Sequence, residues 1–211
     1  ATTTNANTNA NISQVGIRTY NSGAQFEPIQ MGSASSVDYY DIPAPTIVSN
    51  KTLDYNKSFG ISDNRFELLQ NGKVAVVKGN ETIWSNITDI TQGNNSKNNI
   101  NYIEARFRVV GDGDNKTDNH AGIVWNEGDE GKSYYAFIRP DGGLYLATPL
   151  GQELVSASKV SGRGEWYTLK VVDVNGTVNV FLNDVLQIVS PKSLAKNNGD
   201  NATTANANTN A

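Results

Sequence analysis

Apolar and polar residues alternate strictly along residues 101–111 (NYIEARFRVVG). The apolar set is Ile103, Ala105, Phe107 and Val109, and the polar set is Tyr102, Glu104, Arg106 and Arg108. Alternate side chains of a strand point to opposite faces, so this pattern predicts a β-strand with one buried face. We interpret the charged residues of the other face as paired side chains on a solvated surface rather than as a binding site.

Strand signals of this kind recur along the chain, while helix signals are almost absent. Residues 65–79 hold two β-prone runs joined by Asn71-Gly72, the strongest short hairpin signal. Residues 133–150 and 165–190 read as further hairpins, and residues 120–126 as a short strand. The other turns fall at 140–143, Asn175-Gly176 and Asn183-Asp184. Regularly spaced strands with Gly-rich turns predict an all-β fold made of a two-sheet antiparallel sandwich.

The first 50 residues are less regular. Residues 15–31 read as two short strands around a turn at Asn21-Ser22-Gly23, and these strands either join the sandwich or reach elsewhere. Residues 33–50 resemble a linker whose end is stiffened by Pro43 and Pro45.

Four segments between residues 46 and 190 resemble one known superfamily. They are IEARFRV (103–109), AGIVWN (121–126), YYAFIRPDGGLYL (134–146) and GEWYTLKVVDVNGTVNVFLNDVLQ (164–187). Their order is similar to that in concanavalin A-like lectins and glucanases, specifically the laminin-G-like branch, in which Gly is common at the position of Asp184. The resemblance implies a jelly-roll sandwich over residues 46–190, an N-terminal extension over 1–45 and a C-terminal strand or tail over 191–211.

Catalytic members of this superfamily resemble one another in a strand bearing E-x-D-x-E or E-x-D-x-x-E, with two carboxylates about 5 Å apart. That motif does not occur in this sequence. The nearest acidic cluster, NEGDEG (126–131), contains two glycines between predicted strands and reads as a solvated hairpin loop. With no cysteine and with His120 as the only histidine, the sequence indicates neither a zinc site nor a catalytic triad. We therefore expect a protein that is not an enzyme.

The two ends of the chain carry nearly the same phrase. Residues 1–10 (ATTTNANTNA) and 202–211 (ATTANANTNA) differ at one position only. In a strand, the Asn residues of each phrase would form a row on one face. These rows are Asn5, Asn7 and Asn9 at the start, and Asn206, Asn208 and Asn210 at the end. Stacked Asn amides hydrogen-bond along a ladder, so each phrase suits pairing with another strand.

Three interpretations of the terminal phrases are open. They are disordered linkers between repeated domains, or they pair with each other on one sandwich, or the tail of one subunit pairs with a neighbour's sheet. The third is β-augmentation, and a head-to-tail contact of this kind yields a homopolymeric filament or sheath. We expect the third, because a lone polar strand buries too little surface to offset the entropy lost on ordering it.

Uncharged polar residues dominate the composition, with 28 Asn and 17 Thr among 211 residues. The chain holds nine N-x-S/T glycosylation triplets, about twice the number that this composition gives by chance. They begin at Asn11, Asn50, Asn56, Asn80, Asn86, Asn94, Asn115, Asn175 and Asn201. The excess favours covalent N-glycans on a secreted or cell-surface protein, with compositional accident as the alternative.

Charge and hydropathy narrow the set of partners. The formal net charge of −4 gives no basic surface for a phosphate backbone, so nucleic acid is not an expected partner. No run of about 18 apolar residues is present, so we do not expect a membrane-spanning helix. The chain begins at Ala1 without a leader, which fits a processed secreted protein and a trimmed chain equally.

A cluster of oxygen-bearing side chains is a candidate calcium site. Asp112, Asp114 and Asp118, with Asn115, lie within seven residues, and Ca²⁺ prefers such hard oxygen ligands. The resemblance to laminin-G-like domains also implies calcium at a sandwich edge. A plain solvated loop is the alternative, because the spacing is not that of an EF-hand and a closing Glu is missing.

Aromatic residues are candidates for binding an extracellular polysaccharide. We predict that Trp125 and Tyr134 contact sugar, with core packing as the alternative. Further aromatic residues without an obvious place in the core are Tyr39, Tyr40, Trp84 and Tyr145. Trp166 and Phe181 fall in the last hairpin segment and are predicted to lie in the core.

These patterns together predict a secreted, N-glycosylated β-sandwich that serves as a structural subunit of an extracellular or cell-surface filament. The subunits would assemble by head-to-tail pairing of their Asn-rich termini. The alternative is a carbohydrate-binding, lectin-like module of the same fold, which an exposed pair of coplanar aromatic rings would favour.

Overall fold

The structure is a computed structural model that describes residues 12–34, 45–59, 66–70, 74–85, 100–110, 119–127, 132–160, 164–174 and 177–191. Within these ranges the only helix is the four-residue α1 (Tyr55–Ser58). The strands are β1 (Ile12–Phe26), β2 (Gln30–Ala34), β3 (Ile47–Thr52), β4 (Phe66–Leu69), β5 (Val74–Trp84), β6 (Tyr102–Val110), β7 (His120–Glu127), β8 (Lys132–Ile138), β9 (Gly143–Ala147), β10 (Glu153–Lys159), β11 (Tyr167–Val174), β12 (Thr177–Leu182) and β13 (Val185–Pro191). The predicted all-β class is confirmed.

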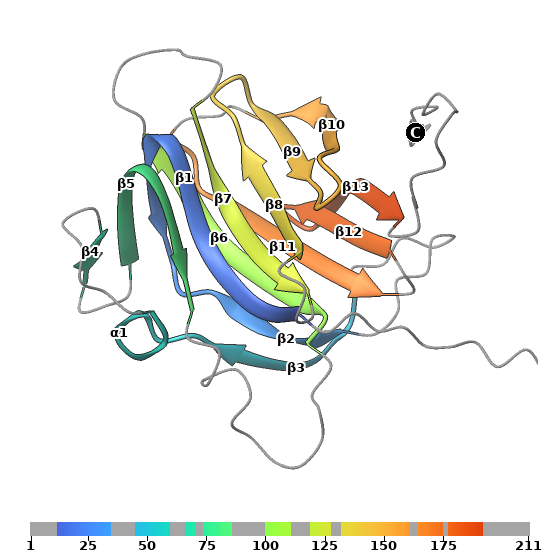
Figure 1. The fold of residues 1–211 in the computed structure, drawn as a ribbon, viewed down its shortest axis with the longest axis horizontal. Coiled ribbons are helices and arrows are strands. Elements are labelled where there is room, and N and C mark those ends of the chain that lie inside the picture. The colour runs from blue at the N-terminus through green and yellow to red at the C-terminus, as the bar shows by residue number, and fades with distance from the viewer. Residues whose placement is uncertain are drawn as a thin grey trace, which may run out of the picture.

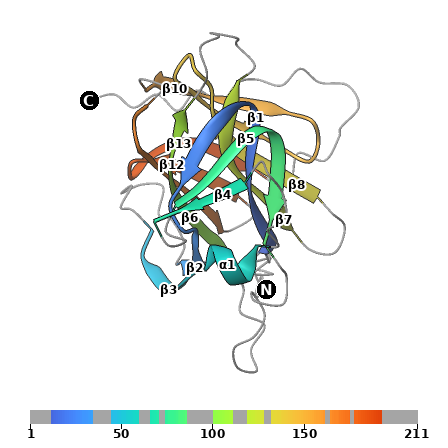
Figure 2. The same ribbon diagram turned by 90° about the vertical axis from the view of Figure 1, so that its left-hand side faces the viewer.

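All of these strands belong to one hydrogen-bonded antiparallel sheet. Its main path runs β10-β9-β8-β7-β1-β6-β11-β12-β13, while β2 pairs with β3 and β6, and β5 pairs with β1 and β4. The sheet curls so far that β10 and β13, at the two ends of the path, come into contact. The result is a nearly closed, barrel-like shell around one core (Figures 1 and 2).

β1 connects the two halves of this shell, because it has partners on both edges. β5 follows one edge, while on the other edge β7 pairs with residues 12–20 and β6 with residues 23–26. Figure 1 shows β1 in blue, curving along β5 and between these partners. The register shifts between Thr19 and Ser22, where Asn21 has a φ of 49°.

The prediction of two short strands around Asn21-Ser22-Gly23 is therefore wrong. These residues lie inside a single strand of 15 residues, at a β-bulge. Asn adopts positive φ more readily than most residues, and a bulge lets a strand bend without leaving the sheet. The stretch expected to be a linker also differs, since β3 begins within it at Ile47.

The core is a single large cluster that runs from Ile12 in β1 to Ile188 in β13. It includes the predicted inward row of β6, whose four side chains are at most 1% exposed. The members of that row are Ile103, Ala105, Phe107 and Val109. Because β1 also contributes to this cluster, the boundary expected near residue 45 separates strands that share one core.

The predicted hairpins are present between β4 and β5, between β8 and β9, and from β11 to β13. In the turn after β8, the backbone N–H of Gly143 donates to Asp141 and holds the pKa of that carboxyl below its usual value. After β12, Asn183 and Asp184 have φ values of 50° and 66°. Both central residues of such a hairpin turn need positive φ, which explains why Gly suits position 184. The turns at Asn71-Gly72 and Asn175-Gly176 lie outside the described residues.

The outer face of β6 and β11 carries paired charges, as the alternation of residues 101–111 predicts. Lys170 Nζ lies 2.6 Å from Asp184 Oδ1 and 3.4 Å from Glu104 Oε2, and Tyr102 donates a hydrogen bond to Glu104. Burial alone would lower the pKa of Lys170, but the hydrogen bond to Asp184 and the charge of Glu104 outweigh it and raise that pKa. Arg106 forms an ion pair with Glu27 in the same row.

Candidate functional site

The two aromatic residues predicted to bind sugar lie inside the shell. Trp125 in β7 and Tyr134 in β8 are cross-strand neighbours, and their rings stack at 5.3 Å with 8° between their planes. They are only 0% and 7% exposed, so neither ring offers a face to a ligand and the prediction is contradicted. Strand periodicity separates the two faces of a sheet but does not say which of them faces the core.

The reverse error concerns Trp166, which was predicted to lie in the core. It is half-buried on the outside, where the guanidinium groups of Arg106 and Arg108 lie 4.9 and 5.1 Å from its ring. Phe181 is buried, but in a small outer cluster with Tyr102 and Val172 rather than in the main core. Trp84 and Tyr145 are half-buried on the outer face, and Tyr39 and Tyr40 lie outside the described residues.

Several predicted sites fall in segments that the structure does not describe. These are the calcium candidates Asp112, Asp114, Asn115 and Asp118, and the assembly candidates Asn5, Asn7, Asn9, Asn206, Asn208 and Asn210. Within the described ranges, no group of three or more His, Cys, Asp or Glu side chains is arranged to hold a metal ion. Nor does any helix in these ranges have the length and apolar character needed to cross a membrane.

Three of the nine glycosylation triplets begin at described residues, and all three acceptor side chains are exposed. They are Asn50 in β3, Asn56 in α1 and Asn80 in β5. Glycan attachment requires such exposure, so these positions are compatible with the prediction. The other acceptors, outside the described ranges, are Asn11, Asn86, Asn94, Asn115, Asn175 and Asn201.

An aromatic row crosses the outer face of β1, β7, β8 and β9. It consists of Tyr20, His120, Phe137 and Tyr145, with successive ring centroids 5.1, 4.4 and 5.4 Å apart. The guanidinium of Arg139 covers the far end, 4.0 Å from the Tyr145 ring. Tyr20 ends the row at β1, where it is 37% exposed. Among the rings of the described residues, it stacks on His120 only.

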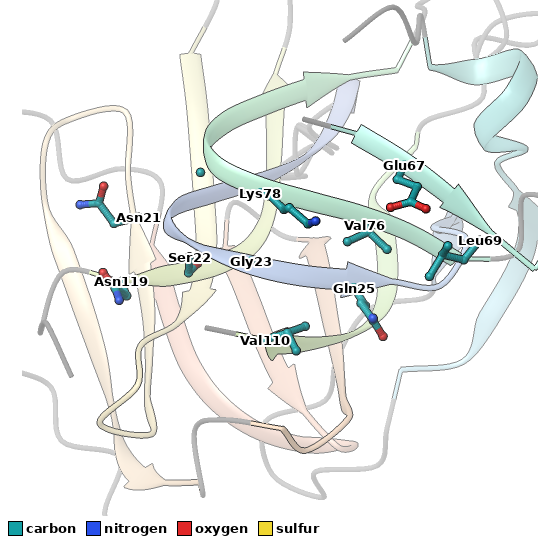
Figure 3. A pocket seen from close by; sticks show the side chains of 11 residues that line it. Asn21, Ser22, Gly23, Gln25, Glu67, Leu69, Val76, Lys78, Val110 and Asn119 are labelled. Carbon is teal, nitrogen blue, oxygen red and sulfur yellow. The ribbon is translucent and has the colours of Figure 1, made fainter. Parts of the chain in front are cut away.

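A groove of about 750 Å³ opens where β1 bulges, and Asn21, Ser22 and Gly23 of the bulged segment line it (Figure 3). Its polar side chains come from β1, β4, β5 and the residue before β7, and they are Asn21, Ser22, Gln25, Glu67, Lys78 and Asn119. Figure 3 shows them around the β1 and β5 ribbons, far apart in sequence and close together in space. The groove is therefore assembled by the pairing of β1 with its neighbours and of β5 with β4.

Gly23 lies in the floor of the groove. It pairs with Lys78 of β5 on one side and with Val110 of β6 on the other. A Cβ atom at this position would lie 2.6 Å from the carbonyl oxygen of Val110, closer than real side chains approach. The absence of a side chain here lets the strands pack closely and leaves the groove open.

The polar groups of the groove differ in how firmly they are held. Gln25 accepts a hydrogen bond from Arg108 Nε at 2.8 Å, which fixes its side chain. Glu67 and Lys78, by contrast, have no ion-pair partner among the described residues. An exposed carboxylate and an exposed ammonium in one groove suit a ligand with many hydroxyl groups.

Sequence reasoning missed this groove, although one signal pointed toward it. The Asn21-Ser22-Gly23 segment predicts a turn between two strands, whereas in the structure it lies at a bulge inside one strand. Comparisons of the chain with protein-family models, with curated proteins and with solved structures find no match.

Proposed function

We propose that this protein is a carbohydrate-binding module of a secreted or cell-surface protein, built as a concanavalin A-like, jelly-roll sandwich. The observation that supports this function is the open groove at the bulge of β1, in which Glu67 and Lys78 have no ion-pair partner in the described chain. The resemblance of four strand segments to laminin-G-like domains supports the same class of fold.

The chemistry of the groove matches that of a sugar. A carboxylate only accepts hydrogen bonds and an ammonium only donates them, whereas each sugar hydroxyl does both, so Glu67 and Lys78 can bind different hydroxyls of one ring. The ring of Tyr20, stacked on His120, directly precedes the lining residue Asn21, and a sugar that extends past the groove would pack its C–H face on this ring. The ligand would thus replace water at groups that are already exposed.

Substitution of groove residues tests this proposal. We expect isothermal titration with cellohexaose, chitohexaose, mannohexaose and oligogalacturonate to detect binding of at least one of them. Because a hydrogen bond to a charged group contributes about 1.5–3 kcal/mol, Glu67→Gln should weaken that binding about tenfold or more. Tyr20→Ala should also weaken it.

Glu153→Gln is the matched control, because Glu153 is an exposed acid of β10 that pairs with Arg139 away from the groove. This variant should bind like the parent protein. Failure of all four oligosaccharides to bind would contradict the proposal, as would unchanged affinity in both groove variants.

A second function, a structural subunit of a filament, is favoured by the phrase shared between residues 1–10 and 202–211. Edge strands with exposed apolar side chains are suitable templates for an added strand. In the described chain, β3 pairs with β2 only and exposes Val48, while β13 pairs with β12 only and exposes Val185 and Val189. Assembly and sugar binding would use different parts of the surface and are compatible.

Truncation of the termini tests the filament. Negative-stain electron microscopy and light scattering should show polymers of the intact chain, and these should disappear when residues 1–11 or 199–211 are removed. Replacing either phrase by one of the same composition in shuffled order serves as the control for chain length. An intact chain that stays monomeric at all concentrations would rule out this second function.

A further inference from the structure

Asn80 begins one of the nine glycosylation triplets and lies directly across from the bulge in β1. The pairing of β1 with β5 sets Thr19 opposite Glu81 and Ser22 opposite Gly79. Asn80 is therefore the single residue of β5 that faces the two bulged residues of β1, Tyr20 and Asn21.

Contacts at this position connect Asn80 to the groove. Its Oδ1 accepts a hydrogen bond from the backbone N–H of Asn21 at 2.5 Å, and Asn21 lines the groove. Lys78 and Gly79, the two residues before Asn80, line it as well. Asn80 is exposed, and a Cβ placed on Gly79 would meet no heavy atom within 4 Å. The space beside Asn80 is thus open to a bulky group.

We propose that Asn80 carries an N-linked glycan whose first sugar lies on Tyr20 and whose remainder covers the groove. In this modification, Nδ2 displaces a lipid diphosphate from C1 of an oligosaccharide. The N–C bond forms, the C–O bond to the diphosphate breaks, and Nδ2 releases one proton. Oδ1 takes no part, so its hydrogen bond to Asn21 persists and fixes the plane of the amide that carries the sugar.

The glycan would regulate the groove. Tyr20 is half-exposed and its ring is stacked on His120, so it provides a rigid surface next to the attachment point. A sugar packed there would lie over Lys78 and compete with any free oligosaccharide. This regulatory consequence rests on the proposed sugar-binding function, whereas the coverage of the groove does not.

Thr82→Ala tests the proposal, because it removes the acceptor triplet and leaves Asn80 and its hydrogen bond in place. Thr82 is exposed, so the fold should tolerate the change. Thr52→Ala is the matched control: it removes the triplet of Asn50, an exposed residue of β3 that does not line the groove. All three proteins are secreted from glycosylating eukaryotic cells, and peptide mass spectrometry reports the occupancy of Asn80 and Asn50.

Acetylation of lysine amines with N-hydroxysuccinimidyl acetate then measures the coverage of the groove. We expect Asn80 to be occupied and Lys78 to react severalfold more slowly in the parent protein and in Thr52→Ala than in Thr82→Ala. Lys159, an exposed lysine of β10, should react at the same rate in all three. Oligosaccharide titrations should show tighter binding to Thr82→Ala than to the parent protein.

Two results would overturn the proposal. One is an unmodified Asn80 in the secreted protein, and the other is equal reactivity of Lys78 with and without the glycan. If no oligosaccharide binds even to Thr82→Ala, the sugar-binding function fails, and the reactivity of Lys78 still decides whether a glycan covers the groove.

Discussion

Gly122→Ala should prevent normal pairing of β7 with β8 and strongly destabilise the protein. Gly122 lies opposite Phe137, under the aromatic row. A Cβ atom here would lie 1.9 Å from the carbonyl oxygen of Ala136 and 2.6 Å from the Cα of Phe137. Both are backbone atoms that cannot rotate away, so the strands themselves would have to separate. We expect a loss of about 3 kcal/mol or more in the free energy of unfolding, at or above the upper end of the usual overpacking cost.

Gly151→Ala is the control for this substitution. Gly151 lies in the turn between β9 and β10, has a φ of 76°, and has no heavy atom within 4 Å of a built Cβ. Its replacement should cost only the strain of a left-handed residue, about 1–2 kcal/mol. Urea unfolding followed by tryptophan fluorescence measures both variants. Equal losses in the two would show that β7 and β8 do not approach as closely as described.

Trp125→Ala should be the most damaging change among the tryptophans. The side chain is fully buried in the main core and stacks on Tyr134, so its removal leaves a large cavity in that core. Replacing a buried aromatic side chain by Ala typically costs about 3–5 kcal/mol. The free energy of unfolding, measured by urea denaturation with circular dichroism, should fall by that amount.

Trp166→Ala provides the comparison, because this ring is half-buried and contacts Arg106 and Arg108 from outside the shell. Loss of two partly exposed cation–π contacts should cost about 1–2 kcal/mol. A larger loss for Trp166→Ala than for Trp125→Ala would contradict the assignment of inner and outer faces. The two variants together thus test which face of the sheet each tryptophan occupies, the property that the sequence predicted wrongly for both.

The strands themselves could be read from local chemistry. Alternation along residues 101–111 predicts β6 and its inward row, because side chains of a strand alternate whatever the strand packs against. The Asn183-Asp184 turn likewise follows from the preference of these residues for positive φ. Such features depend on a few neighbouring residues, and this is why they need no knowledge of the rest of the fold.

Asn21 shows where local chemistry stops being sufficient. An Asn-Ser-Gly segment permits positive φ, and both a hairpin turn and a β-bulge use that conformation. The choice between them depends on whether the chain on both sides keeps the same partner. Here β5 pairs with β1 before and after the shift, so the segment becomes a bulge inside one long strand.

Composition and periodicity were enough to predict an all-β chain with its hairpins, because those properties follow from short stretches of sequence. The orientation of each face and the location of the groove depended on tertiary structure. Trp125 faces the core and Trp166 faces outward because the sheet curls to one side, and no residue carries that information alone. The groove brings Gly23, Glu67 and Lys78 together, since β5 pairs with β1 on one edge and with β4 on the other.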